Sequence, residues 1–523
     1  MRIAIVGTGP TGIYALKHLI EGGKVAEVHL FERGEEAGIG LPYSSENVIT
    51  SMLANIASIE IPSIVETYLD WLGGLPAGVL QSYGVEPAKL DNRRFTPRLL
   101  LGLYFRDQLL ALVDRAAAAG VLVEVRECTE VSDIIPQDGL LALSITDRSD
   151  AGPFDRVILA TGHEFPEADE ATRSYYPSPW SGLIQARVPA VRVGVLGTSL
   201  SGIDAVMAVA NQHGKFVLLE DGLTFETTAT GLHLTMMSWT GVLPEADFYC
   251  PIPYEPLTIM TDAAVADCTR KSAPLDAVFD LFSAEITAAD PTYAARIALS
   301  GLTADTFSPA YFAAREAQDP FRWARKNLEE VEHNKAHKIT VPWRYAILRM
   351  HEKVEEIVQG LPESDRERFD KGLKKVFVDN YAAVPSESIR RLLALREAGV
   401  LSVLALGDDY DLKRDAQGTK VTANGAVHDF DVFIDARGQK PLASSDLRFP
   451  TLRRALLDAD QETPEVGDDY SLLDIPAYAG LVMAAIPYLM HDRPFVQGIT
   501  ASADIGQALA RGMVTTRRRR RWA

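Results

Sequence analysis

The feature that most constrains the fold is a glycine-rich turn at the start of the chain. Residues 2–6 (RIAIV) form a short apolar run with β-branched side chains, which is typical of a buried strand. The sequence GTGPTG follows directly at 7–12, and the apolar spacing after it predicts a helix. A second strand is predicted over 25–31, and Glu32 follows it. This order of strand, turn, helix, strand and acidic residue predicts an α/β unit that binds a dinucleotide.

Each glycine of this turn has a physical role. Gly7 permits the tight turn, Gly9 lets the backbone approach a pyrophosphate, and Gly12 lets the helix pack close to the strand. The helix N-terminus offers unpaired N–H groups to the phosphates. Glu32 is positioned to accept hydrogen bonds from ribose hydroxyls. The predicted dinucleotide site comprises Gly7, Thr8, Gly9, Pro10, Thr11, Gly12, Glu32 and Arg33.

A second copy of the turn follows a predicted strand at 191–196. It reads GTSLSG, so Ser199 replaces the middle glycine, which the fold allows if the backbone stands slightly further from the phosphate. The nucleophile elbow GxSxG is an alternative, but its last position here is Ser201 and no triad partner is indicated. The second copy predicts a second cofactor site. Its expected residues are Gly197, Thr198, Ser199, Leu200 and Gly202.

The residue that reads the second ribose depends on where the next strand lies. An Asp-Gly dipeptide separates two strand-like runs within 215–227, which indicates a β-hairpin. In that interpretation, which we prefer, the next strand is 232–238 and Trp239 takes the ribose position. If the first of the two runs is the strand instead, Glu220 takes that position and favours NADH.

Each glycine turn is followed later in the chain by a strand that ends in a similar tripeptide. Residues 155–162 read DRVILATG, and residues 431–438 read DVFIDARG. Thr161 and Gly162 form a small corner with a hydrogen-bonding side chain, which we expect near the first cofactor. The paired motifs predict two stacked dinucleotide domains.

This pairing resembles the FAD/NAD(P)H flavoproteins with two dinucleotide-binding domains, a group that contains flavin monooxygenases, Baeyer–Villiger enzymes and amine N-hydroxylases. Residues 38–44 (GIGLPYS) and 236–248 (MMSWTGVLPEADF) further resemble one bacterial branch, some members of which are flavin-dependent N-oxygenases of small amino acids. The resemblance covers most of 1–260 and 375–510. It implies FAD at the first turn and NADPH or NADH at the second. It also implies flavin contacts for Gly40, Leu41, Tyr43, Asn55, Thr500 and Asp504.

Two residues depart from the pattern of that branch. Trp239 stands where an arginine able to bind a 2′-phosphate is expected, which puts a preference for NADPH in question. Arg437 interrupts the second ATG-like tripeptide. No catalytic residue is assigned from the sequence; the candidates are Arg344, Arg437 and Asp504. Arg344 could clamp a carboxylate substrate, but ordinary surface charge on a helix is the interpretation that we prefer.

The predicted fold class is α/β, with two Rossmann-like domains and a mainly helical insertion that serves as a lid or substrate domain. His333 and His337 have the spacing of metal ligands on a helix, but their charged surroundings indicate a solvated face, so no metal site is predicted. The predicted parts are an FAD-binding domain at 1–185 and 440–514, an NAD(P)-binding domain at 186–261 and 401–439, the insertion at 262–400, and a basic tail at 515–523.

The composition excludes several classes of protein and partner. The formal net charge is −19, which disfavours general nucleic-acid binding. No run of ~18 apolar residues is free of charged or turn residues, so no membrane helix is expected. The first strand begins at once, which leaves no room for a signal peptide. The 3 cysteines form no paired motif, so we expect a cytoplasmic protein. A homo-oligomer stays open.

These features predict an FAD-dependent monooxygenase that uses NAD(P)H and O2 through a C4a-hydroperoxyflavin. Its substrate would be an amine nitrogen of a small polar molecule such as an amino acid. One alternative is an NAD(P)H-dependent flavin oxidoreductase or dehydrogenase that does not oxygenate. Another is a noncatalytic flavin-binding interaction protein.

Overall fold

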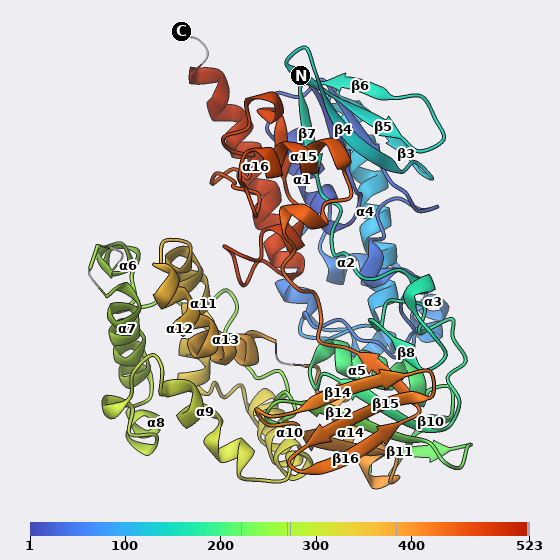
Figure 1. Cartoon of the computed structure of the whole chain (residues 1–523), viewed down its shortest axis with the longest axis vertical. Coiled ribbons are helices and arrows are strands. Elements are labelled where there is room, and N and C mark those ends of the chain that lie inside the picture. The colour runs from blue at the N-terminus through green and yellow to red at the C-terminus, as the bar shows by residue number, and fades with distance from the viewer. Residues whose placement is uncertain (221, 269, 272, 383, 520–523) are drawn as a thin grey trace. The chain divides into compact units, whose positions relative to one another are not determined.

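The computed structural model forms two compact units, which we describe separately (Figure 1). The first consists of Met1–Glu164 and Gln439–Ala523, and the second of Phe165–Gly438. The structure describes the backbone of residues 1–220, 222–268, 270–271, 273–382 and 384–519. Side chains from residue 514 on lie outside the described part, and with them the predicted basic tail at 515–523. The domain boundaries proposed from the sequence stay predictions.

The first unit is built on a five-stranded parallel sheet. Its order is β18 (Leu481–Met483), β7 (Arg156–Leu159), β1 (Arg2–Val6), β2 (Glu27–Phe31) and β3 (Leu122–Arg126). Ile3 and Ile5 are fully buried, because helices or strands cover both faces of the sheet. Helices α1 (Pro10–Glu21) and α16 (Gly498–Arg519) pack so closely that a Cβ atom on Gly506 would lie 2.7 Å from the carbonyl carbon of Tyr14.

The second unit repeats this sheet, which confirms the predicted pair of Rossmann-like domains. Its five parallel strands follow the order β13 (Leu401–Ala405), β12 (His233–Ser238), β9 (Arg192–Leu196), β17 (Val432–Asp435) and β8 (Tyr175–Tyr176). Strands β1 and β9 therefore hold the same central position, and each leads into a glycine turn. In open parallel sheets of this kind, ligands bind at the carboxyl ends of the strands, where the direction of the connections reverses.

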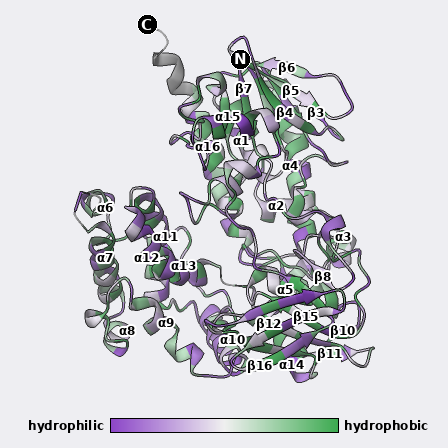
Figure 2. Ribbon diagram, in the orientation of Figure 1, coloured by the Kyte–Doolittle hydropathy of each residue, from purple (hydrophilic) through white to green (hydrophobic). Residues whose placement is uncertain are grey.

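Each parallel sheet is accompanied by a three-stranded antiparallel sheet inserted before the ATG-like strand. In the first unit its strands are β4 (Val131–Gln137), β5 (Leu140–Ile145) and β6 (Ala151–Phe154). In the second they are β14 (Asp411–Asp415), β15 (Gly418–Ala423) and β16 (Ala426–Phe430). Strand β14 is almost entirely exposed and polar, and its region is purple in Figure 2. The two units thus share the antiparallel sheet and four strands of the parallel sheet, but not the origin of the fifth: β18 follows β7 in the chain, whereas β8 precedes β9.

The preferred hairpin interpretation is confirmed. Strands β10 (Gly214–Leu219) and β11 (Gly222–Thr227) pair antiparallel, and β12 then pairs parallel with β9. Glu220 therefore lies at the hairpin and not at the ribose position, so the alternative that favoured NADH is wrong. The hairpin forms a two-stranded sheet of its own, separate from the five-stranded parallel sheet.

The predicted helical insertion is also present in the second unit. Asp319 begins α10 by accepting hydrogen bonds from the N–H groups of Phe321 and Arg322.

No helix in the described part of the chain is both long and apolar enough to cross a membrane. The insertion contains α6 (Asp262–Cys268), α7 (Pro274–Ala289), α8 (Pro291–Arg296), α9 (Phe307–Glu316), α10 (Pro320–His337), α11 (Pro342–Val358), α12 (Glu363–Lys371) and α13 (Leu373–Tyr381). The other helices are α2 (Tyr68–Gly74), α3 (Ala77–Ser82), α4 (Arg98–Ala118), α5 (Leu200–Ala210), α14 (Ser386–Glu397) and α15 (Pro450–Asp458).

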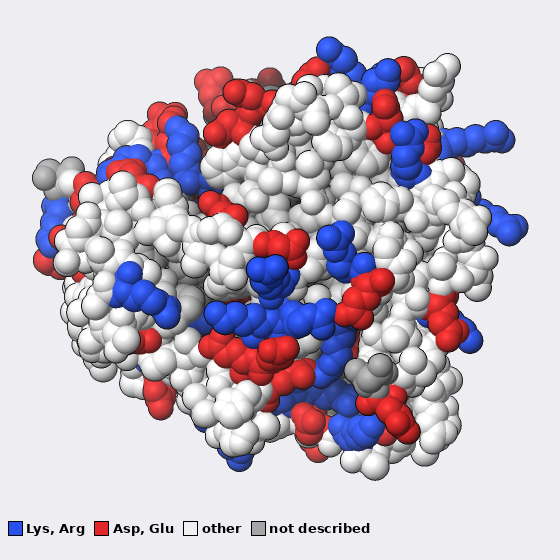
Figure 3. All heavy atoms as spheres, turned by 90° about the horizontal axis from the view of Figure 1, so that it is seen from below, with Lys and Arg blue, Asp and Glu red and all other residues white. Residues whose placement is uncertain are grey.

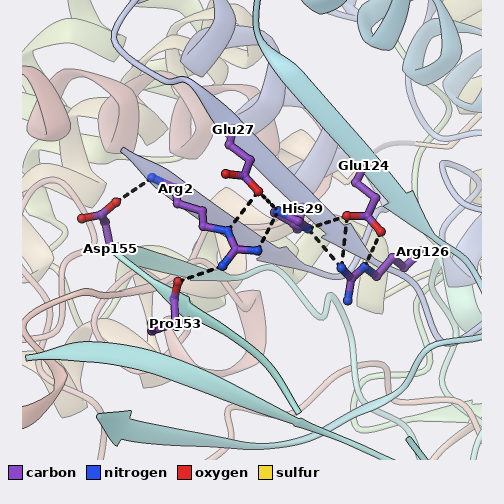
Figure 4. Close-up of polar contacts among 7 residues, drawn as sticks. All are labelled: Arg2, Glu27, His29, Glu124, Arg126, Pro153 and Asp155. Atoms are coloured by element: carbon purple, nitrogen blue, oxygen red, sulfur yellow. Dashed lines mark hydrogen bonds and ion pairs between the residues drawn. The ribbon is translucent and has the colours of Figure 1, made fainter. Parts of the chain in front are cut away.

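A chain of polar contacts crosses the first sheet from β1 to β3 (Figure 4). His29 is almost fully buried, and its ring nitrogens lie 2.5 Å from Glu27 Oε1 and 2.9 Å from Glu124 Oε2. Arg2 donates to Glu27 at 3.0 Å, and Arg126 donates to Glu124 at 2.8 Å. The hydrogen bond from His29 holds the pKa of the Glu27 carboxyl below its ordinary value. These contacts join three neighbouring strands and support their register.

The surface carries many charges of both signs. Figure 3 shows basic and acidic side chains close to one another across the face drawn there. Exposed ion pairs contribute only about 0–1 kcal/mol each, because water and salt screen them. The stability of the fold therefore depends mainly on the buried apolar faces of the two sheets and of the helices.

Candidate cofactor sites

The first glycine turn joins β1 to α1. Gly7 has a φ of +96°, and a Cβ atom there would lie 2.3 Å from the carbonyl oxygen of Ala160. A Cβ atom on Gly12 would lie 2.3 Å from the carbonyl oxygen of Gly7. Position 9 is different: its φ is −67°, and a Cβ atom would touch only Gly40 Cα at an ordinary 3.5 Å. The fold therefore requires glycine at positions 7 and 12 but not at position 9.

Thr8 connects the turn to the acidic residue at the end of β2. Its buried Oγ1 donates to Glu32 Oε2 at 2.6 Å and accepts a hydrogen bond from the N–H of Gly38 at 3.0 Å. Glu32 Oε1 accepts from the N–H of Gly34 at 2.9 Å. These contacts orient the carboxylate, which has four lone-pair sites and so keeps capacity for ribose hydroxyls. Arg33, the next residue, is exposed.

The segment that resembles the flavin-contacting branch does lie against this turn. A Cβ atom on Gly40, whose φ is +77°, would lie 3.1 Å from Pro10 Cδ and 3.3 Å from Gly9 Cα. Tyr43 follows on a short 3-10 helix (Leu41–Tyr43). Burial raises the pKa of the Tyr43 phenol to about 12, so the phenol stays protonated. The structure thus brings Gly9, Pro10, Gly40 and Tyr43 together. Asn55 is exposed on a separate loop.

Helix α16 reaches the same turn through a residue that the sequence analysis did not select. Ser502 is buried, and its Oγ lies 3.0 Å from Thr11 Oγ1. Thr500 and Asp504, which were selected, are exposed on other faces of α16. The hydrogen bond from Ser502 Oγ to the carbonyl of Gly498, at 3.0 Å, shows that Ser502 faces back along the helix. The packing of α16 against α1 alone determines that Ser502 is buried at the turn while Thr500 and Asp504 are exposed.

The corner after β7 contains a buried polar atom that fits a bound group. Thr161 Oγ1 is buried, and among the described residues it has no hydrogen-bond partner. Buried hydroxyls normally have partners, so an unpartnered one beside the glycine turn is consistent with a bound cofactor. A Cβ atom on the neighbouring Gly162 would meet nothing within 4 Å. The open space at Gly162 leaves room for such a group.

His163 follows Thr161 and Gly162 directly. Burial lowers the pKa of its imidazole from 6.5 to about 4, and a hydrogen bond with Gln439 opposes this effect only partly. The unfolded chain therefore takes up a proton between pH 6.5 and about 4 that the folded chain does not. Stability from this group is present above pH 6.5 and is lost as the pH falls towards 4.

We expect His163→Gln to flatten this dependence. The neutral amide removes a contribution of up to ~3 kcal/mol to the change in free energy of unfolding between neutral and acidic pH. Urea unfolding of both proteins with saturating FAD, across that pH range, measures the difference. If the free energy of unfolding changed with pH to the same extent in wild type and variant, His163 would titrate normally.

The second glycine turn, between β9 and α5, makes the same two close backbone contacts as the first. A Cβ atom on Gly197 would lie 2.5 Å from the carbonyl oxygen of Ala436, and one on Gly202 would lie 2.3 Å from the carbonyl oxygen of Gly197. Ser199 is exposed at the N-cap of α5, and its side chain makes no capping hydrogen bond. Thr198 is buried and Leu200 begins the helix. This helix N-terminus can bind a second pyrophosphate.

The register of the second sheet shifts the predicted ribose position by one residue. Phe31 pairs with Val6 and precedes Glu32, and Met237 pairs in the same way with Leu196. Ser238, and not Trp239, therefore corresponds to Glu32. Trp239 lies one residue further, 48% exposed, and its indole N–H donates to Asp408 Oδ1 at 2.8 Å.

The three candidate catalytic residues lie on different elements. Asp504 is on α16, and Arg437 is exposed after β17, where it donates to Asp435 at 2.9 Å and 2.6 Å. Arg344 is on α11 and only 3% exposed. The preferred interpretation of Arg344 as surface charge is therefore wrong, because the packing of α11 buries the face that carries it.

Comparison with known proteins agrees with this geometry. Residues 4–164 match a family described as FAD-NAD(P)-binding. This part of the chain is therefore an FAD/NAD(P)-binding domain, and FAD and NAD(P) form its cofactor class, as the resemblance implied. Residues 261–381 match a second family, the YdhS-like middle domain. The chain is 52% identical over 530 residues to the uncharacterized protein YdhS of Escherichia coli K12, covering 99% of both chains. It belongs to the YdhS family.

Solved structures share the fold at low sequence identity. One is the ornithine N-hydroxylase KtzI of Kutzneria sp. 744, with a TM-score of 0.52, 15% identity, and 98% of this chain and 99% of that chain covered. Another is the reduced form of the ornithine hydroxylase PvdA of Pseudomonas aeruginosa, with a TM-score of 0.50, 12% identity, and 98% and 99% covered. The chain thus shares the fold of these two hydroxylases.

Proposed function

We propose that this chain is an FAD-dependent monooxygenase that oxygenates an amine nitrogen of a small amino acid. One oxygen atom of O2 enters the N–H bond and the other becomes water. NAD(P)H and the substrate each supply two of the four electrons that reduce O2. The main support for the proposal is that each of the two units contains one glycine turn suited to a dinucleotide. A flavin oxygenase needs two dinucleotides. Bound FAD supplies the acceptance of hydride and the activation of O2.

The residues of the chain bind and orient the cofactors in this account. Gly9 lets the backbone approach the FAD pyrophosphate, and Glu32, oriented by Thr8, accepts hydrogen bonds from the adenosine ribose. Thr161 offers its buried hydroxyl to FAD. Ser199 and the N-terminus of α5 bind the pyrophosphate of NAD(P)H.

Two further observations support the choice of reaction. Cys128, Cys250 and Cys268 form no disulfide among the described residues and no CxxC pair, which argues against a dithiol that passes electrons to a disulfide substrate. KtzI and PvdA, which share the fold, are named as hydroxylases of ornithine, which supports an amine as the oxygenated group. The cytoplasm is the compartment that we propose, from the isolated cysteines.

The proposal is tested by reduction and oxygen uptake of the FAD-loaded protein. We expect NADPH or NADH to bleach the flavin under anaerobic conditions. In air, a matching amino acid from a panel should increase oxygen uptake. Reduction without any effect of the panel would favour a plain flavin oxidoreductase, and a flavin that neither nicotinamide reduces would favour a noncatalytic flavin-binding protein.

We further infer that Lys375 contributes to a preference for NADPH. Its ammonium lies 4.1 Å from the centroid of the Trp239 ring, next to the ribose position, where it can approach a 2′-phosphate. Burial lowers the pKa of Lys375, but Asp408 and Glu316 oppose this effect.

We expect Lys375→Ala to raise the KM for NADPH by ~5-fold, equivalent to ~1 kcal/mol, with little change for NADH. Steady-state oxidation of each nicotinamide measures this. Lys374→Ala is the matched control, because Lys374 pairs with Asp370 at 2.8 Å. If Lys375→Ala raised the KM for NADPH and for NADH equally, Lys375 would not contribute to a preference for NADPH.

A further inference from the structure

The helical insertion and the segment that follows β12 bury a cluster of four charged side chains within the second unit. Glu245 comes from that segment, Arg315 from α9, Arg344 from α11 and Asp379 from α13. None of their side chains is more than 12% exposed. Charged groups are rarely buried unless they are paired. A charged atom of the cluster that lacks a partner therefore indicates where a ligand can bind.

The carboxylates of the cluster have partners. Arg344 Nη1 lies 3.0 Å from Glu245 Oε2, and Trp323 Nε1 donates to Glu245 Oε1 at 2.8 Å. Arg315 Nη1 and the Tyr311 hydroxyl both donate to Asp379 Oδ2, at 2.5 Å and 2.8 Å. Burial raises the pKa of the Glu245 carboxyl, but Arg344 and Arg315 lower it further than burial raises it, so Glu245 stays ionised. The cluster thus balances two cations with two anions.

One edge of Arg344 does not have a partner. Its Nε and Nη2 atoms are buried, and neither has a hydrogen-bond partner among the described residues. Arg315 Nε is buried and unpartnered in the same sense. An unsatisfied buried donor costs about 1–3 kcal/mol, and more when it is charged. Nε–H and Nη2–H point the same way along one edge of a guanidinium, and this edge binds a carboxylate through two parallel hydrogen bonds.

We propose that the Nε/Nη2 edge of Arg344 binds the carboxylate of a small amino acid. The ring of Phe248 covers one face of the guanidinium, with its centroid 4.4 Å from Cζ, and so prevents a ligand from stacking on that face. A planar group with two oxygens and a single charge matches that edge. The cluster is neutral, and the zwitterion of a small amino acid adds no net charge to it, whereas a phosphate would add one or two negative charges that no side chain of the cluster balances. The statement that this ligand is the substrate rests on the proposed function; the binding itself does not.

The test is calorimetric titration of the FAD-loaded full-length chain without NAD(P)H. Glycine, L-alanine, L-aspartate and L-lysine are each compared with their α-carboxamides. At least one acid should bind, and its amide should bind ~10-fold or more weakly, because the amide replaces one charged acceptor oxygen with a donor. Arg344→Lys keeps the charge beside Glu245 but removes the two-donor edge, so it should abolish the preference for acid over amide. Arg325→Lys is the control, since Arg325 on α10 forms a half-exposed pair with Glu397 of α14.

Several outcomes would overturn this assignment. They are the absence of binding by every acid below ~10 mM, equal affinity for acids and amides, and an unchanged preference in Arg344→Lys. A purely structural Arg344 would lower the melting temperature of the variant without changing the preference. If Arg344→Lys does not fold, the comparison of acids with amides on the wild type decides. Acid binding without stimulated oxygen uptake would retain this inference and reject the proposed function, whereas oxygenation of amines with no acid binding would do the reverse.

Discussion

Replacing Gly9 with alanine is expected to weaken FAD binding by ~10- to 100-fold, equivalent to ~1–3 kcal/mol, while the protein stays folded. The methyl group would meet only Gly40 Cα at 3.5 Å, and the φ of −67° suits any residue, so the chain itself accepts alanine. The methyl group instead occupies the space through which the backbone approaches the pyrophosphate. Flavin content after purification and fluorescence titration with FAD measure the effect.

The matched control is Gly78→Ala, because a Cβ atom on that α3 glycine would meet nothing within 4 Å. Gly7→Ala and Gly12→Ala are a second comparison: both would place a methyl group 2.3 Å from a backbone oxygen, so we expect them to lower the melting temperature as well as the flavin content. Full FAD affinity in a folded Gly9→Ala protein would show that the cofactor does not approach this turn.

Replacing Ser199 with aspartate is expected to raise the KM for NAD(P)H by ~100-fold and to leave FAD content unchanged. The negative charge would face the pyrophosphate at the N-terminus of α5, and juxtaposed like charges cost several kcal/mol. The same charge favours the helix, because aspartate is a good N-cap and Ser199 makes no capping hydrogen bond. The variant should therefore be at least as stable as the wild type.

Anaerobic flavin reduction at a series of NADPH and NADH concentrations measures this effect. Ser199→Asn is the control, because it keeps the N-cap preference and the size of aspartate without its charge. Reduction of Ser199→Asp at the wild-type rate across the series would place the nicotinamide elsewhere. A loss of FAD in this variant would contradict the assignment of one dinucleotide to each turn.

The sequence was sufficient to predict the fold, because its strongest signals are local. The glycine turns, the apolar strands beside them and the Asp-Gly hairpin each depend on a few neighbouring residues, and all lie where they were expected. The matching order of four strands in the two sheets follows from those units, since the same crossover rules apply to both; the fifth strands, β18 and β8, come from opposite ends of their units. What the sequence did not reveal is that the repetition extends to the antiparallel sheets, whose strands are short and irregular.

Residues of the candidate sites were less predictable wherever tertiary packing decides. The shift from Trp239 to Ser238 follows from a pairing register, which no local pattern specifies. Ser502 and the exposed Thr500 lie in one polar segment, and only the contact of α16 with α1 separates them. Arg344 looked like surface charge because arginine is rarely buried, and its burial depends on a partner, Glu245, that lies far away in sequence.

The most direct test of the central claim is a reaction under isotopically heavy O2. The FAD-loaded protein is incubated with NADPH or NADH and with the amino acid that most increases oxygen uptake. The account predicts that mass spectrometry finds one heavy oxygen atom on the amine nitrogen of the product, with one NAD(P)H consumed for each molecule formed. NAD(P)H oxidation that yields only heavy hydrogen peroxide, with the amino acid recovered unchanged, would contradict it.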